Sequence, residues 1–144
     1  MPRQVAPPPS AEFRIVLSKP FSGPPTHQIE VIGEHNRSAI IRVTNYTSNA
    51  KSLEKRGDVP HDDVRELIAL ISSLRGFPSD ESRDIYGYDV KLVFNTFEFQ
   101  WSNQDDDPAA AGVEVADEQK EDFKRIADSI EALARQFAKV SSAV

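Results

Sequence analysis

Residues 90–101 read VKLVFNTFEFQW, and this stretch decides the fold of the chain. With Asn95 and Thr96 as a two-residue turn, the two arms form a β-hairpin in which every second side chain faces the same side. The residue pairs on one side are all apolar: Phe94 with Phe97, Leu92 with Phe99, and Val90 with Trp101. The other side is mostly polar. We therefore expect the hairpin to pack its apolar side against amphipathic helices.

Two segments predict such helices, and the first begins at Pro60. Asp62 and Asp63 lie in its first turn, where carboxylates favour the positive end of the helix dipole, and Gly76 marks its end. Its apolar stripe consists of Val64, Leu67, Ile68, Ile71 and Leu74.

The second predicted helix is longer and has Asp117 as its N-cap. Its apolar residues, from Phe123 to Val140, keep helical spacing for about five turns. On its polar side, Glu131 and Arg135 stand four residues apart, a spacing at which opposite charges pair on a helix surface.

Three further strands are predicted before the first helix. Alternating apolar residues indicate strands around residues 13–17 and 29–31, and residues 38–44 (SAIIRVT) indicate a third. Residues 45–58 are mostly polar and are expected to form a long exposed loop. The predicted fold class is α+β, with a mainly antiparallel five-stranded sheet, two helices packed on it, and the order β-β-β-α-β-β-α.

A length of 144 residues suits one domain. Residues 1–11 contain three consecutive prolines and are predicted to be a disordered leader. Residues 12–140 are expected to form the single α+β domain, and residues 141–144 a flexible tail.

The composition excludes several classes of function. The sequence has no cysteine, which excludes disulfides, thiolate zinc sites and thiol nucleophiles. Its net charge of −6 argues against a nucleic-acid partner. No apolar run approaches the roughly 20 residues that span a bilayer, so no membrane partner is expected. The first residues lack the apolar segment of a secretory signal, which predicts a cytoplasmic protein.

No motif in the sequence points to a catalytic site. His61 beside Asp62 and Asp63 can form an acid–base or metal cluster, but neighbouring residues of a helix point in different directions, so we interpret them as a helix start. The aspartates at 105–107 lack the alternating spacing of a calcium loop and are expected to be solvated. We predict a protein that is not an enzyme and has no catalytic residue, cofactor or metal.

Two exposed segments are candidates for binding a protein partner. In the 18–26 loop, Phe21 stands between prolines, where it either presents its ring to a partner or folds back onto the sheet. In the 45–57 segment, basic side chains either meet an acidic partner or remain solvated. The predicted partner-binding residues are Lys19, Phe21, Ser22, Gly23, Lys51, Lys55 and Arg56.

The order of these elements resembles that of a known family. FRIVLSKPFSG begins at Phe13, VPHDDVRELIAL begins at Val59, and a hairpin preceded by tyrosines and a final helix follow. Over residues 13–137, the chain is similar to the emfourin-like inhibitors of thermolysin-type metallopeptidases, which are small cytoplasmic bacterial proteins. The resemblance implies a non-catalytic, loop-presented binding surface and a metallopeptidase partner. The chain departs from the family pattern in the 45–58 segment and the Gly-Pro-Pro turn at 23–25.

Three functions stay open at this point. The first is a non-enzymatic protein-binding domain that presents loops to a partner, as a peptidase inhibitor does. The second is a subunit or adaptor of an intracellular assembly, in which the last helix or the hairpin contacts a neighbour. The third is a small-molecule enzyme with a scattered site, which predicts a deep polar pocket. We favour the first, because conspicuous loops on a complete scaffold occur together with missing catalytic motifs.

Overall fold

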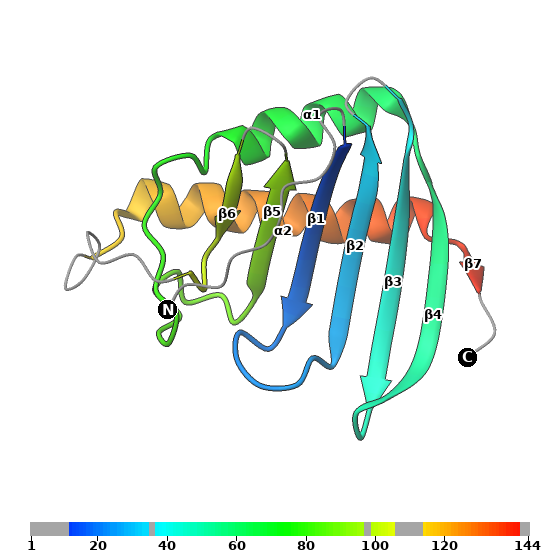
Figure 1. Ribbon diagram of the computed structural model, residues 1–144, viewed down its shortest axis with the longest axis horizontal. Helices are drawn as coiled ribbons and strands as arrows, with labels where there is room; N and C mark the ends of the chain where they lie inside the picture. Colours follow the sequence, from blue (N-terminus) through cyan, green and yellow to red (C-terminus); the bar gives the residue numbers. More distant parts are fainter. Residues whose placement is uncertain (1–11, 35–36, 97–98, 106–113, 142–144) are drawn as a thin grey trace.

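The fold is a seven-stranded antiparallel sheet with two helices on one of its faces (Figure 1). This computed structural model describes residues 12–34, 37–96, 99–105 and 114–141, so the predicted leader and residues 142–144 lie outside the described part. The strands are β1 (Glu12–Lys19), β2 (His27–Glu34), β3 (Ala39–Thr47), β4 (Ala50–Val59), β5 (Lys91–Thr96), β6 (Gln100–Ser102) and β7 (Val140–Ser141). Their order across the sheet is β6-β5-β1-β2-β3-β4-β7.

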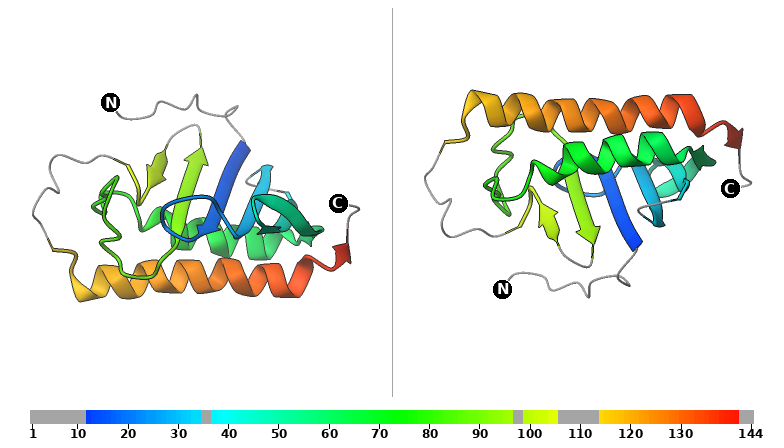
Figure 2. Two further views of the ribbon diagram at one scale, coloured as in Figure 1. Left: turned by 90° about the horizontal axis from the view of Figure 1, so that it is seen from below. Right: turned by 90° about the horizontal axis from the view of Figure 1, so that it is seen from above.

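Both helices, α1 (His61–Ser72) and α2 (Asp117–Phe137), cover the same face of the sheet (Figure 2). The predicted α+β class, the antiparallel sheet and the two helices are therefore confirmed. The N-cap of α2 is Ala116 rather than the predicted Asp117, which is the first helical residue. Within the described ranges, neither helix is long and apolar enough to cross a membrane.

The predicted strand number and order are wrong, because the sheet contains β4 and β7 in addition to the five predicted strands. Residues 45–58 are not a loop. β3 continues to Thr47, and β4 follows a turn at Ser48 and Asn49, whose φ angles are 51° and 65°. Two consecutive residues with positive φ are typical of a tight hairpin turn that matches the twist of its strands. β4 has a polar sequence because only the two-residue β7 lies beyond it at this edge of the sheet.

The predicted hairpin forms, but its turn lies two residues further along the chain than expected. Phe94 pairs with Trp101 instead of Phe97, which is outside the described residues, and the other predicted pairs shift in the same way. Thr96 closes the turn, because its N–H donates to the carbonyl oxygen of Phe99 (2.9 Å) and its hydroxyl accepts the N–H of Phe99 (3.0 Å). The pairing shifts by an even number of residues. Because side chains alternate between the two faces of a strand, the same side chains still face the helices.

The apolar side of this hairpin belongs to the core, as predicted. The ring of Tyr86 stacks on Phe123 of α2, with ring centroids 4.4 Å apart, and Trp101 lies 6.3 Å from the same ring. Burial of each large apolar side chain contributes about 1.5–3 kcal/mol to stability. The largest fully buried side chains are Phe13, Phe123, Ile15, Leu17, Ile29, Ile41, Ile71, Leu74, Leu92, Ile126, Ile130 and Val31.

The face of the sheet opposite the helices is polar and carries a row of alternating charges. The row crosses β1 to β4 in the order Arg14, Glu30, Arg42, Glu54 and Lys51. Its nitrogen-to-oxygen distances run from 2.6 Å to 3.6 Å. Among the described residues, only Ile40 and Val140 expose large apolar side chains. This face therefore has no broad apolar patch that requires a cover.

The end of α2 packs directly against β4 at Gly57. A Cβ atom at Gly57 would overlap the carbonyl oxygen of Phe137, the last residue of α2. Immediately afterwards the chain forms β7, in which Ser141, expected at the start of the flexible tail, pairs with Lys55. The absence of a side chain at Gly57 thus lets the helix end and the final strand approach the sheet.

Replacing Gly57 with alanine should destabilise the protein. In an ordinary strand this change is favourable, because alanine loses less backbone entropy on folding. Here the added methyl group must displace the backbone at Phe137, and we expect a loss of about 1–3 kcal/mol, as for an overpacked core. Urea unfolding monitored by tryptophan fluorescence measures the change. The matched control is Asp58→Ala, at an exposed neighbouring position; equal stability of the two variants would contradict the close contact.

Candidate functional site

Three connections meet at one end of the sheet, which we call the loop end (Figure 1). They are the 18–26 loop between β1 and β2, the turn between β3 and β4, and residues 84–90 before β5. Four of the seven predicted binding residues, those of the 18–26 loop, lie here, together with polar side chains from α2.

The aromatic ring of Phe21 folds back into the protein instead of facing solvent. Phe21 is 5% exposed, which resolves the two alternatives that its sequence context leaves open. Its N–H donates to Oδ1 of Asp89 (3.1 Å), and its carbonyl oxygen accepts a hydrogen bond from Nε2 of Gln104 (3.1 Å). Phe21 is therefore an anchor of the loop and is not available as a contact for a partner.

The base of the same loop is closed by hydrogen bonds between backbone atoms. The N–H of Thr26 donates to the carbonyl oxygen of Lys19 (2.7 Å), and the N–H of Tyr46 donates to the carbonyl oxygen of Thr26 (2.9 Å). Between the anchor and this closure, residues 22–24 (Ser-Gly-Pro) are exposed; we call them the loop tip. Gly23 has a φ of +88°, a conformation that favours glycine, although its surroundings are open.

The basic residues predicted in the 45–57 segment are on a strand and not on a loop. Lys51 belongs to the charge row, with its Nζ 3.3 Å from Glu54. Lys55 and Arg56 lie in the middle of β4, where β7 pairs with them. Only Lys51, close to the β3–β4 turn, is near the loop end. Lys51, Lys55 and Arg56 therefore do not form one continuous binding surface with the loop tip.

A row of polar side chains follows the last apolar row on the helix-facing side of the sheet. Leu17, Ile29 and Val43 are buried register partners on β1, β2 and β3. Because side chains alternate along a strand, the next helix-facing positions are two residues away, and they hold Lys19, His27 and Asn45, which are again register partners. The core therefore ends in a polar row at the loop end.

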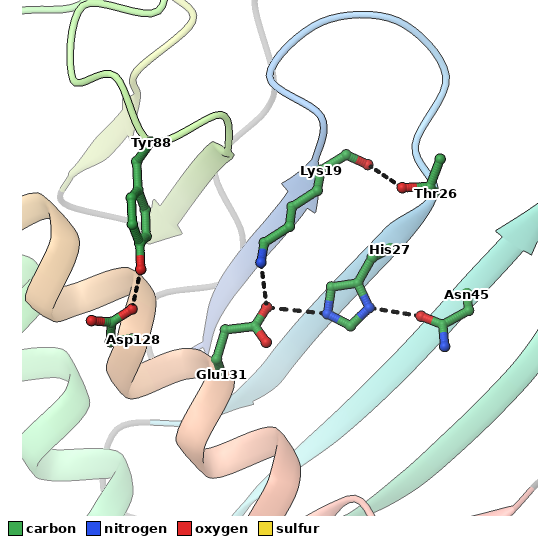
Figure 3. Close-up of polar contacts among 7 residues, drawn as sticks. All are labelled: Lys19, Thr26, His27, Asn45, Tyr88, Asp128 and Glu131. Atoms are coloured by element: carbon green, nitrogen blue, oxygen red, sulfur yellow. Dashed lines mark hydrogen bonds and ion pairs between the residues drawn. The ribbon is translucent and has the colours of Figure 1, made fainter.

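Glu131 of α2 contacts this polar row (Figure 3). Its Oε1 lies 3.1 Å from Nε2 of His27 and 3.6 Å from Nζ of Lys19. The other ring nitrogen of His27, Nδ1, is 2.7 Å from Oδ1 of Asn45. The predicted pairing of Glu131 with Arg135 on the helix surface is thus replaced by contacts with the sheet.

A polar hollow of about 360 Å³ lies beside these contacts, between the sheet and α2. Its lining residues are Leu17, Lys19, Tyr88, Val90, Ala127, Asp128, Glu131 and Arg135. The three apolar members are buried, whereas Lys19 and Arg135 reach solvent. The polar hollow can therefore hold a small polar group against an apolar floor.

Tyr88 closes one side of the polar hollow by donating its hydroxyl hydrogen to Oδ1 of Asp128 (Figure 3). This hydrogen bond raises the pKa of Tyr88 from 10.0 to about 12; partial burial and the negative charges of Asp128 and Glu131 act in the same direction. The neutral phenol is therefore the form that the folded state favours. Tyr88 and Asp128 tie the segment before β5 to α2.

The sequence interpretation predicts Lys19 as a binding residue but misses the other polar residues of the hollow. They come from separate elements, since Tyr88 precedes β5 whereas Asp128, Glu131 and Arg135 lie on α2. One signal was present, since Asp128, Glu131 and Arg135 follow helical spacing and form a polar stripe beside the apolar one. That stripe alone does not indicate which part of the sheet it meets.

The candidate metal and acid–base groups do not assemble into a site in the described part of the chain. The side chain of His61 has its Nε2 buried without a hydrogen-bond partner, and Asp62 and Asp63 lie in the first turn of α1. Asp105 follows β6, and its two aspartate neighbours at 106–107 are outside the described residues. The ranges that the structure describes contain no group of three or more His, Asp or Glu side chains placed to hold a metal ion.

Comparisons with family models and with curated proteins give no match. The resemblance to emfourin-like inhibitors therefore stays a prediction that rests on the sequence motifs.

Replacing Asp128 with asparagine should lower the pKa of Tyr88 from about 12 towards 10.0, because the charge that stabilises the phenol is lost. An NMR titration of the tyrosine ring carbons, assigned with Tyr88→Phe, measures this pKa. Because the folded-state pKa is raised, the contact stabilises the wild-type fold below pH 10.0, and its contribution is lost as the pH rises through about 12.

The matched control for this titration is Asp122→Asn, which removes a carboxylate from α2 that pairs with Arg125 instead. Its Tyr88 should titrate as in the wild type. An unchanged Tyr88 pKa in Asp128→Asn would show that the hydroxyl does not donate to Asp128.

Proposed function

We propose that this chain is a non-enzymatic protein-binding domain that presents the loop tip, residues 22–24, to a protein partner. The observation that carries the proposal is that the 18–26 loop is held on both sides of an exposed tip. The buried Phe21 and its two hydrogen bonds hold one side, and the backbone bonds of Thr26 hold the other.

A loop held in this way favours binding for an energetic reason. Binding that immobilises a flexible side chain costs about 0.5–1.5 kcal/mol of free energy for each side chain. Ordering a mobile backbone costs more. In this loop, folding has already ordered the backbone next to the tip. Ser22, Gly23 and Pro24 also have small or rigid side chains, so a partner can approach the backbone closely.

The resemblance to emfourin-like inhibitors makes a thermolysin-type metallopeptidase the first partner to test. In this proposal the domain occupies the peptidase as an inhibitor in the cytoplasm. The loop tip itself requires only a partner with a cleft that accepts it. The proposal therefore extends to any protein with such a cleft.

Replacing Ser22 with arginine should weaken partner binding at least about tenfold, because a large side chain at the tip obstructs close approach. Binding is measured by peptidase inhibition and by affinity capture from the source cell followed by mass spectrometry. Ser22 is a better choice than Phe21, because Phe21 is buried and its replacement would also disturb the fold.

The matched control is Ser72→Arg, which places the same side chain at an exposed position at the end of α1. It should bind the partner as the wild type does. If Ser22→Arg binds as tightly as this control, the loop tip is not the contact and the proposal fails.

A small-molecule function is the second candidate, and the polar hollow favours it. A scattered catalytic or binding site predicts a polar pocket, and about 360 Å³ of space lined by four charged residues meets that expectation in part. The hollow lies at the end of the core and not within it, because the interior between sheet and helices is filled by apolar side chains. This position at the loop end, outside the packed interior, is the reason that we rank protein binding first.

A further inference from the structure

We infer that the polar hollow binds a carboxylate group between Lys19 and Arg135 and, building on the proposed function, that an Asp or Glu side chain of the protein partner supplies it. Arg135 lines the hollow but has no ion pair within the described part of the chain. Its neighbour one turn earlier, Glu131, is turned towards the sheet instead.

The pairing of charges in the hollow leaves Arg135 for a further anion, although the four charged lining residues balance in sign. Oε1 of Glu131 is shared by Lys19 and His27, at 3.6 Å and 3.1 Å. Asp128 accepts the hydrogen bond of the Tyr88 hydroxyl. Both carboxylates of the hollow thus have donors, whereas the guanidinium of Arg135 pairs with no carboxylate among the residues that the structure describes. A further carboxylate can pair with Arg135 and use the remaining N–H donors of Lys19.

The floor of the hollow strengthens such a contact. Leu17 and Val90 are 0% exposed and Ala127 is 1% exposed, so one side of the bound group would face buried apolar atoms. Charge–charge attraction and charged hydrogen bonds are stronger where water is displaced. With a volume of about 360 Å³, the hollow has room for an acidic side chain.

Lys19 links the hollow to the loop tip. Its carbonyl oxygen closes the base of the 18–26 loop through Thr26, while its ammonium group faces Glu131 in the hollow (Figure 3). In this proposal, a partner seated on residues 22–24 extends past Lys19, and its acidic residue enters the hollow.

The affinity of the hollow for a carboxylate is tested without any partner, using N-acetyl-glutamate amide as the probe. Its uncharged counterpart, N-acetyl-glutamine amide, is titrated at the same ionic strength, adjusted with sodium chloride. We expect saturable NMR shifts at Lys19, Tyr88 and Arg135 with the glutamate probe alone. Equal shifts with both probes, or no saturable shift up to about 0.1 M probe, would overturn the inference.

Replacing Arg135 with glutamine should lower the affinity for the glutamate probe about fivefold, which is the effect expected for a partly exposed ion pair. The matched control is Arg125→Gln, on the same helix but paired with Asp122 and outside the hollow. Unchanged probe affinity in Arg135→Gln, or an equal loss in Arg125→Gln, would show that Arg135 does not hold the carboxylate.

The source of the carboxylate is tested with the partner that the wild-type protein binds. Arg135→Gln should lower the affinity for that partner several-fold, whereas Arg125→Gln should leave it unchanged. If the glutamate probe binds but Arg135→Gln binds the partner normally, the hollow serves a free small carboxylate and the partner assignment is wrong. If the loop-tip variant Ser22→Arg leaves partner binding intact, the proposed function fails, whereas the probe titration still decides whether the hollow binds carboxylates.

Discussion

The packing of α2 across the sheet is the interaction on which the rest of the structure depends. Near its start, Phe123 is fully buried and stacks on Tyr86. Further along, Glu131 reaches the polar row of the sheet, and at its end the helix packs so closely on β4 that only glycine fits at position 57. The same helix therefore completes the core, builds the polar hollow and positions the final strand.

Because the helices cover only one face of the sheet, each strand must have two different sides. On the covered face the side chains are apolar until Leu17, Ile29 and Val43, and polar one row later. On the open face, one row of charged side chains alternates in sign, and its neighbours pair across the strands. The loop end is thus the place where the apolar layer stops and polar groups from sheet and helix meet. This is the physical reason that a site forms there.

The sequence predicts most accurately the elements whose apolar residues recur with a clear period. The strands around Phe13 and Ile29, and both helices, have clear periodicity and form close to where the sequence predicts them. The predicted end of the second helix is wrong, because α2 ends at Phe137 and Val140 belongs to β7. The sequence did not predict β4, because an edge strand needs few apolar residues and its charged sequence resembles that of an exposed loop. The hairpin turn was misplaced because Asn95-Thr96 and the actual turn leave the same residues facing the core, and periodicity cannot distinguish them. Within the candidate site, the loop tip and Lys19 were predicted, whereas the role of Phe21 depended on burial that the sequence does not show.

The sequence by itself determined the α+β class, the two amphipathic helices and the sides of the strands that form the core, because each of these is set by spacing between residues close together in the chain. Only the tertiary structure decided that β4 joins the sheet, that Phe21 anchors its loop, and that His27 and Lys19 meet Glu131. These contacts join residues up to 104 positions apart, and they depend on the direction in which α2 crosses the strands. Local periodicity specifies which face of a helix is buried, but packing against the whole sheet determines which polar groups lie opposite its other residues.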